Sequence, residues 1–412
     1  MLHALLLFWL AAPFTPQHAA QLRAKILAAL FVPQPLPGID AKSYGTFEPM
    51  AGVVAERITY ATEYNLRAPA ILYMPKNKPR GKMPALIVVN GHGGDKYSWY
   101  SFYSGMLYAQ AGAAVLTYDA IGEGERNIQH KSGTRAHDHY VAPDEMGQRM
   151  GGLMMTDLRQ AVSYLSSRPE VDPRRIAAMG YSMGSFVVAL TCAVETRLHA
   201  CVEVGGGDLD GEGGMWESRG KSMCQGIPYF TLRFLGDRPA VLYALQAEHG
   251  HTLIYNGSAD TVVKIPEHYL DFFADMRKRT LALLGSSPAA KNIFDYDFYP
   301  NTSHRPYFVT KPVALWLNRQ LHFPNWTDAQ IEAMPVTHII DWAKANDVAM
   351  DRGYISEERE GGTPALGTGI PGVPREELNV LPRDEWEKVK DTMILESWLA
   401  DAKKQVTDGS RK

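Results

Sequence analysis

The sequence contains few cysteines, little net charge and no apolar run long enough to cross a membrane. Its 412 residues include three cysteines, Cys192, Cys201 and Cys224, and none has Cys-x-x-Cys or Cys/His metal-ligand spacing. We therefore expect no metal site, and we interpret the cysteines as buried free thiols. The alternative is that one pair forms a disulfide in an exported protein. The net charge of −3, without a basic cluster, argues against nucleic acid as a partner.

The N-terminus carries a short apolar segment from Ala4 to Ala12. This segment is too short to span a bilayer, and we expect no membrane span in the mature chain. It is typical of a secretory signal peptide, although no Lys or Arg precedes it and no clear Ala-x-Ala cleavage site follows. We interpret it as favouring a secreted or periplasmic protein. The alternative is an amphipathic helix that packs on the domain of a cytoplasmic protein.

Strand-like and helix-like segments alternate along the chain. Two strands at 53–62 and 68–75 predict an antiparallel hairpin at the start. The later strands are expected at 85–90, 113–119, 175–182, 199–204, 251–256 and 293–299, and helices at 102–112, 151–169, 265–284, 307–321 and from residue 183. This alternation predicts an α/β fold with a mainly parallel, twisted sheet, helices on both faces and an antiparallel N-terminal edge.

The segment "MGYSMG" lies where an expected strand meets an expected helix. In such a turn, a serine between two glycines sits on a strained backbone with its hydroxyl exposed above the sheet. Gly180 and Gly184 remove side chains that would collide with neighbouring elements. The N–H groups at the start of the next helix point to the same place, which favours negative charge there. Ser182 is therefore our candidate nucleophile.

A serine hydroxyl needs a histidine base and an acid that orients this histidine. The loop "GSADTVVK" places Asp260 after one expected strand, and "PNTSHRPYF" places His304 after the next. Both loops lie at the carboxyl ends of parallel strands, where open α/β sheets bind ligands. We predict Ser182, His304 and Asp260 as a catalytic triad. Glu203, at the end of the 199–204 strand, is the alternative acid.

A serine hydrolase also needs backbone donors that bind the oxyanion of the tetrahedral intermediate. We expect one from the N–H of Met183, directly after the nucleophile. The second is expected from the glycine-rich loop "NGHGGDK", with Gly94 as the donor and Gly93 as the near alternative. The His92 side chain in this loop is expected to brace the loop and to take no part in the chemistry.

Several of these motifs together resemble one known family. "NGHGG", "YDAIGEGER" (118–126), the segment 157–185 that contains "SRPEVDP", "NGSADTVV" and "SHRPYF" are similar to the acetyl xylan esterase and dienelactone-hydrolase-like branch of the α/β-hydrolases. The resemblance covers residues 45–322. It implies a cofactor-independent serine hydrolase that acts on carboxylic esters, with carbohydrate acetyl esters among the candidates. Dienelactone hydrolases have a cysteine nucleophile, and the serine at position 182 argues against that exact activity.

Two segments are candidates for the substrate rim. One is the excursion 205–240, which is rich in glycine and contains Trp216. The other is 94–103, in which Tyr97, Trp99 and Tyr100 could stack on a sugar; for both, packing of the aromatic rings onto the domain is the alternative. The charged segment 124–140 predicts a solvated surface loop.

The sequence predicts three parts: an N-terminal lead-in at 1–44, a catalytic domain at 45–322 and a helical extension at 323–412. The extension contains two helix-like stretches joined by the Gly/Pro-rich "EGGTPALGTGIPGVP". We expect these stretches to pack on the domain or on another subunit and to carry no chemistry. A serine peptidase or acyltransferase is the alternative enzyme, and a binding protein on a hydrolase scaffold is the alternative of another class. The oligomeric state does not follow from the sequence.

Overall fold

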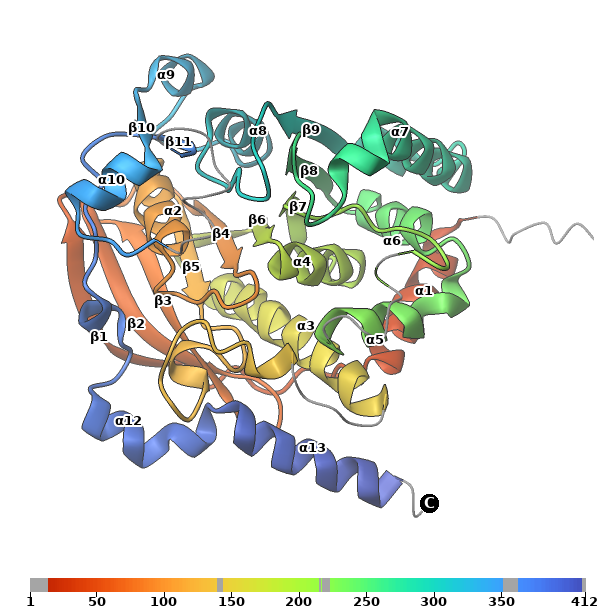
Figure 1. The fold of residues 1–412 in the computed structure, drawn as a ribbon, viewed down its shortest axis with the longest axis horizontal. Coiled ribbons are helices and arrows are strands. Elements are labelled where there is room, and N and C mark those ends of the chain that lie inside the picture. The colour runs from red at the N-terminus through yellow and green to blue at the C-terminus, as the bar shows by residue number, and fades with distance from the viewer. Residues whose placement is uncertain (1–13, 139–143, 215, 217–222, 351–361, 410–412) are drawn as a thin grey trace, which may run out of the picture.

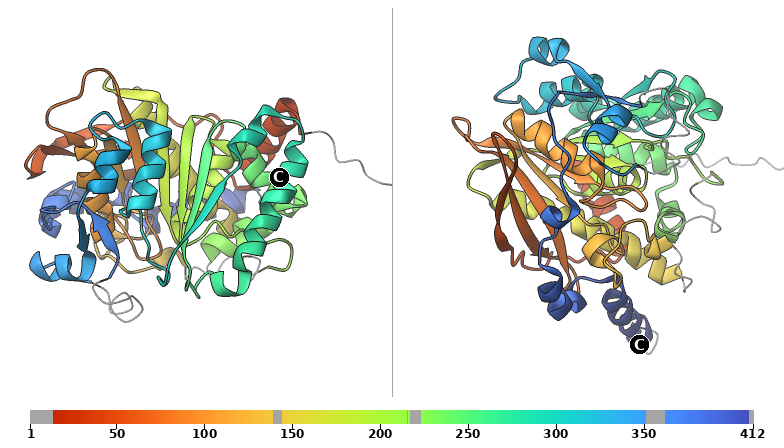
Figure 2. Two further views of the ribbon diagram at one scale, coloured as in Figure 1. Left: turned by 90° about the horizontal axis from the view of Figure 1, so that it is seen from above. Right: turned by 60° about the vertical axis from the view of Figure 1, so that its left-hand side comes forward.

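The structure is a computed structural model that describes residues 14–138, 144–214, 216, 223–350 and 362–409. Its centre is a sheet of nine strands, flanked by helices on both faces (Figures 1 and 2). The strands are β1 (Lys42–Met50), β2 (Val53–Ala61), β3 (Arg67–Pro75), β4 (Met83–Val89), β5 (Ala114–Tyr118), β6 (Val171–Tyr181), β7 (Leu198–Val204), β8 (His251–Gly257) and β9 (Asp295–Tyr299). The apolar segment from Ala4 to Ala12 lies outside the described residues.

The order of the strands separates an antiparallel edge from a parallel centre. The order is β1-β2-β3-β5-β4-β6-β7-β8-β9. β1, β2, β3 and β5 pair antiparallel, whereas β5, β4, β6, β7, β8 and β9 are parallel neighbours. This arrangement confirms the predicted fold class. The structure extends the predicted hairpin by one strand, because β1 was not predicted and pairs with β2 at the edge.

Helices cover both faces because the central strands are apolar on both sides. Alternate residues of β4 show this: Leu86 and Val88 belong to one buried cluster, with α2 and α8, whereas Ala85 and Ile87 belong to another, with α3 and α4. The helices up to residue 321 are α1 (Pro16–Ala29), α2 (Trp99–Gln110), α3 (Asp144–Ser167), α4 (Met183–Val194), α5 (Met223–Thr231), α6 (Arg238–Ala247), α7 (Ile265–Leu284) and α8 (Lys311–Leu321).

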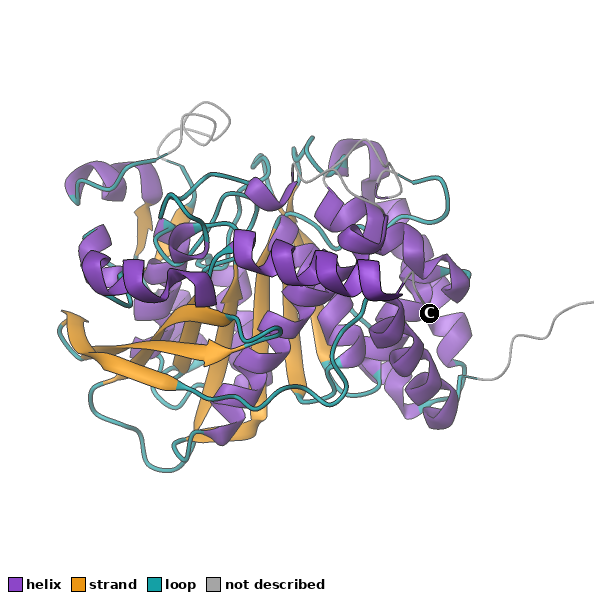
Figure 3. Ribbon diagram, turned by 90° about the horizontal axis from the view of Figure 1, so that it is seen from below, coloured by secondary structure: helices purple, strands orange, loops and turns teal. Residues whose placement is uncertain are grey.

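The C-terminal extension packs against two of the hydrophobic clusters of this domain. It contains α9 (Asp328–Ala333), β10 (Val336–His338), α10 (Ile339–Ala345), β11 (Pro364–Leu366), α12 (Arg383–Val389) and α13 (Leu395–Gly409), and β10 pairs antiparallel with β11. Helices α10 and α13 lie at different places around the domain (Figure 1), and Figure 3 shows the helices and strands of the fold from below. The first stretch was expected to be one helix. It is instead broken into α9, β10 and α10, and the break falls at Pro335, which cannot donate a helical hydrogen bond.

Two further expectations are corrected by the structure. Cys192 of α4 and Cys201 of β7 form a disulfide, so only Cys224 remains outside a disulfide. The 124–140 segment is a solvated loop only in part: residues 128, 129, 131–133 and 135 are exposed, whereas Arg126 and His137 are fully buried and Arg126 pairs with Asp157. Among the residues that the structure describes, no helix combines the length and the apolar character needed to cross a bilayer.

Candidate active site

Ser182 lies in a sharp turn between β6 and α4. Its φ of 54° and ψ of −115° place a residue with a side chain in a region that glycine normally occupies. The flanking glycines allow this turn, because a Cβ on Gly180 would lie 2.1 Å from the carbonyl oxygen of Gly184. A Cβ on Gly184 would lie 2.2 Å from the carbonyl oxygen of Val89. The two glycines therefore let β6, α4 and the end of β4 approach closely around one exposed hydroxyl.

The loops after β8 and β9 bring an acid and a base to this hydroxyl. His304 Nε2 lies 2.9 Å from Ser182 Oγ, and His304 Nδ1 lies 2.8 Å from Asp260 Oδ2. Asp260 is fully buried, and its other oxygen accepts hydrogen bonds from the N–H groups of Val262 (2.9 Å) and Val263 (3.3 Å). These bonds fix the carboxylate, which in turn orients the imidazole toward the serine.

Glu203, the alternative acid, is placed elsewhere. Its Oε2 lies within hydrogen-bond distance of the hydroxyl oxygen of Tyr243 on α6, at 2.7 Å. Burial raises the pKa of Glu203 to about 8. The space beside His304 is instead occupied by Gly205, where a Cβ would lie 3.0 Å from His304 Cε1. The geometry therefore favours Asp260 as the partner of His304.

The loop after β4 reaches the nucleophile through Gly91, not through Gly94. A Cβ on Gly91 would lie 3.1 Å from Ser182 Cβ. The N–H of Gly94 donates to the carbonyl of Gly91 at 3.0 Å, so it is used within the loop, and this contradicts its predicted role as an oxyanion donor. Within the described part of the chain, the N–H of His92 has no hydrogen-bond partner. His92 directly follows Gly91 in the chain, and Gly91 approaches Ser182 closely, so this N–H belongs to the part of the loop next to the nucleophile.

A cavity of about 760 Å³ is lined by the chain neighbours of two triad residues, Tyr181 before Ser182 and Arg305 after His304. The turn residue Tyr181, Arg305 after the base, and the loop from His92 to Asp95 form one part of its wall. Tyr97, Trp99 and Tyr100 of the predicted rim also line it. Trp99 and Tyr100 are buried; Trp99 packs edge-to-face against Tyr307, and Tyr100 stacks on it. These two rings therefore both line the cavity and pack onto the domain.

Another part of the wall comes from the C-terminal extension, which was expected to pack on the domain or on another subunit and to carry no chemistry. Residues 346–350 and 372–375, together with Leu378, line the cavity. Arg375 lies over the Tyr97 ring at 3.7 Å and donates to Ser132 at 2.7 Å, which joins the extension to the rim. No local pattern in the sequence signals this role, because these residues reach the cavity only through the packing of the extension on α2.

Trp216 is not part of this cavity wall. It is buried, and its ring stacks on Phe186 of α4 in a hydrophobic cluster that also contains Tyr229. The structure therefore corrects the prediction that Trp216 belongs to the substrate rim. The described part of the 205–240 excursion packs against α3 and α4 and contributes to the core.

Two family models and several known proteins match parts of this chain. A family model described as acetyl xylan esterase matches residues 47–204, and the model of the prolyl oligopeptidase family matches residues 143–330. YtaP of Bacillus subtilis (strain 168), which is named as a hydrolase, is 29% identical over 144 residues, or 34% of this chain and 48% of YtaP. The chain thus spans about half the length of this relative.

Solved structures share the fold at low sequence identity. Methylesterase BT1017 has a TM-score of 0.51 at 17% identity, over 90% of this chain and 68% of that chain. A protein of Bacteroides fragilis NCTC 9343, titled as an acetyl xylan esterase, has a TM-score of 0.50 at 14% identity, over 69% of this chain and 74% of its own. At these identities the likeness establishes the fold.

Proposed function

We propose that this chain is an α/β-hydrolase related to the acetyl xylan esterases and that it hydrolyses carboxylic esters with Ser182 as the nucleophile. The observation that carries this proposal is the continuous contact from Asp260 through His304 to Ser182, at 2.8 and 2.9 Å. The strained turn supports it, because backbone strain of this kind is characteristic of functional sites.

The mechanism follows from these contacts. His304 Nε2 accepts the proton of Ser182 Oγ as the oxygen attacks the ester carbonyl, and Asp260 stabilises the resulting imidazolium. The N–H groups of Met183 and His92 donate to the oxyanion. His304 then returns the proton to the leaving alcohol. A water molecule, deprotonated by His304, releases the acid from the acyl-enzyme, so no cofactor takes part in these steps.

The cavity lined by Tyr181 and Arg305 is the proposed site for the larger part of the substrate. At about 760 Å³ it is large enough for a sugar or a group of similar size. Its wall combines aromatic rings with the carboxyl groups of Asp95 and Asp347 and the guanidinium groups of Arg305 and Arg375. Such a wall suits a polar, hydrogen-bonding substrate better than a long acyl chain. We therefore propose esters with a short acyl or alkyl group on a carbohydrate or similar small molecule.

The test is hydrolysis of p-nitrophenyl acetate, butyrate and octanoate by the unmodified protein, by Ser182→Ala and by Ser163→Ala. Ser163 is a serine on α3 outside the site and is the matched control. We expect turnover that is fastest with acetate, is abolished in Ser182→Ala and persists in Ser163→Ala. Turnover that survives in Ser182→Ala contradicts the proposed nucleophile. If neither form turns over, labelling of Ser182 by a fluorophosphonate distinguishes a selective hydrolase from a binding protein.

A peptidase is the second candidate, supported by the match of residues 143–330 to the prolyl oligopeptidase family. The same triad would attack an amide, and the cavity would then hold a short peptide. Prolyl peptide p-nitroanilides assayed beside the esters decide between the two. Amide hydrolysis at a rate comparable to that of the acetate would favour the peptidase, and its absence favours the esterase.

A further inference from the structure

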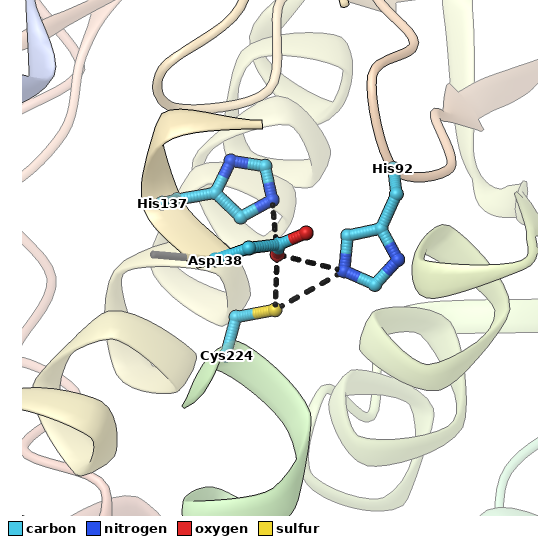
Figure 4. Close-up of side chains that lie close together, drawn as sticks. All are labelled: His92, His137, Asp138 and Cys224. Carbon is cyan, nitrogen blue, oxygen red and sulfur yellow. Dashed lines mark hydrogen bonds and ion pairs between the residues drawn. The ribbon is translucent and has the colours of Figure 1, made fainter. Parts of the chain in front are cut away.

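Four side chains from three separate segments converge behind the oxyanion loop (Figure 4). His92 belongs to the loop after β4, His137 and Asp138 belong to the short 3-10 turn Ala136–Asp138, and Cys224 belongs to α5. Each offers one donor atom, and these atoms all lie within 4.8 Å of one another. His137 and Cys224 are buried, and the side chain of Asp138 is only 3% exposed.

Four of the six separations between the donor atoms are 3.0–3.3 Å, and all six are within 4.8 Å. His92 Nε2 lies 3.0 Å from Asp138 Oδ1 and 3.3 Å from Cys224 Sγ. Asp138 Oδ1 lies 3.3 Å from Cys224 Sγ and 3.2 Å from His137 Nε2. With zinc bonds of about 2.0–2.3 Å, donor atoms at the corners of a tetrahedron lie about 3.3–3.6 Å apart. A small outward shift of each donor would therefore make room for an ion.

His137 supplies an independent indication of a ligand. Its ring is fully buried, and neither ring nitrogen forms a hydrogen bond of acceptable geometry with a described residue; Nε2 points into the cluster and faces Asp138 Oδ1 at 3.2 Å, as in an ion pair (Figure 4). A buried ring nitrogen without a hydrogen bond is unfavourable in a folded protein unless something else compensates it. A metal ion at the centre of the cluster would do so.

A second catalytic Cys-His-Asp triad does not explain the cluster. In a triad, the acid and the nucleophile contact different nitrogens of the histidine. Here Asp138 and Cys224 both contact the same nitrogen, Nε2 of His92. Asp138 Oδ1 in turn contacts both imidazoles and the sulfur, which is the arrangement of ligands around a common centre.

We propose that His92, His137, Asp138 and Cys224 bind one Zn²⁺ ion. Thiolate and imidazole donors together favour zinc over magnesium or calcium, which prefer oxygen. Binding releases the thiol proton of Cys224 to solvent, and the metal takes the place of that proton. Four protein ligands leave no open position, so the ion is structural. The sequence predicts no such site, because the four residues have no ligand spacing along the chain.

The ion would hold together three segments around the candidate active site. His92 follows Gly91, the residue that contacts Ser182, and its own N–H is the proposed second oxyanion donor. Zinc on its side chain would fix this loop against α5 and against the loop of His137. This effect on catalysis rests on the proposed function, whereas binding of the metal does not depend on it.

The test begins with the full-length protein stripped by a chelator and titrated with Zn²⁺ alone. We expect one tightly bound Zn²⁺ per chain and a melting temperature several degrees above that of the stripped protein. Co²⁺ in place of Zn²⁺ should give the visible absorption of a tetrahedral ion and a thiolate-to-metal charge-transfer band in the near ultraviolet. If the stripped, folded protein binds no Zn²⁺ at micromolar concentration, the proposed metal site is refuted. The proposed esterase function is not affected by that result.

The variants Cys224→Ser and His137→Gln identify the ligands. Each should weaken Zn²⁺ binding at least tenfold, and Cys224→Ser should abolish the charge-transfer band. His251→Gln, at the start of β8 and outside the cluster, is the matched control and should bind Zn²⁺ as the unmodified protein does. Undiminished binding with an unchanged Co²⁺ spectrum in Cys224→Ser would refute the assignment. If a variant fails to fold, the charge-transfer band of the unmodified protein still tests the thiolate ligand.

Discussion

Glu203 is expected to make the protein less stable as the pH rises, and Glu203→Gln should remove this effect. The hydroxyl of Tyr243 lies 2.7 Å from Glu203 Oε2 and 2.5 Å from the carbonyl oxygen of Gly207. A phenol carries only one proton to donate. Both contacts are satisfied when Glu203 is protonated, donating to the Tyr243 oxygen while Tyr243 donates to Gly207. The geometry thus supports the neutral carboxylic acid.

The size of the effect follows from the pKa of this group in the two states. Burial raises the pKa of Glu203 from 4.5 to about 8 in the folded protein. An unfolded chain therefore loses this proton at a lower pH than the folded chain does. The contribution to stability is fully present below pH 4.5 and is lost as the pH rises toward 8. Between pH 5 and pH 8 the loss is on the order of 3 kcal/mol, since one pKa unit corresponds to about 1.4 kcal/mol.

Urea unfolding at pH 5 and at pH 8 measures this effect. A glutamine amide can donate to Tyr243 as the protonated acid does, and it does not ionise. Glu203→Gln should therefore be similar to the unmodified protein at pH 5 and on the order of 3 kcal/mol more stable at pH 8. Glu48→Gln, at an exposed ion pair with Lys76, is the matched control and should change little at either pH. Equal pH dependence in Glu203→Gln and the unmodified protein would refute the reasoning.

Three other substitutions test the site and its support. Asp260→Asn should lower kcat by about 10⁴-fold through loss of the acid that orients His304, with little change in stability; a kcat within tenfold of the original would contradict this role. Gly184→Ala should abolish ester hydrolysis and fluorophosphonate labelling, because its Cβ would lie 2.2 Å from the carbonyl oxygen of Val89; full activity would show that the turn tolerates a side chain. Lys96→Met should lower the free energy of unfolding by about 3–5 kcal/mol, because it leaves the buried carboxylates of Asp119 and Glu125, now 2.5 and 2.7 Å from Lys96 Nζ, without their cation. An unchanged midpoint in urea titrations would contradict this expectation.

Local patterns were sufficient to locate the residues of the candidate triad. The glycines on both sides of Ser182 are required by the backbone of a single turn, so the six-residue segment 179–184 is sufficient to predict that turn. Asp260 and His304 each follow a strand-like run directly, and parallel strands bring their carboxyl ends to one edge of the sheet. The sequence favoured Asp260 as the acid and left Glu203 as an alternative, and the two are separated by the packing that directs the Glu203 side chain to Tyr243.

In the glycine-rich loop after β4, the local sequence did not identify the oxyanion donor. A run of glycines predicts a close approach of the backbone, but it does not say which N–H is used inside the turn. The hydrogen bond from Gly94 to Gly91 decides this, and it depends on the exact path of the loop. The aromatic residues are similar: Tyr97 and Trp216 have the same kind of neighbourhood in sequence, yet one lines the cavity and the other stacks on Phe186.

The sequence by itself determined the α/β class, the order of the central elements and the positions of Ser182, Asp260 and His304, because periodicity and turn chemistry act between near neighbours. Only the tertiary structure decided that the C-terminal extension walls the cavity, that Cys192 pairs with Cys201, and that His92, His137, Asp138 and Cys224 converge. A hydrophobic pattern shows that a face is buried but not which distant segment covers it, since apolar burial is not directional. Contacts between segments far apart in the chain are therefore settled only when the whole core packs.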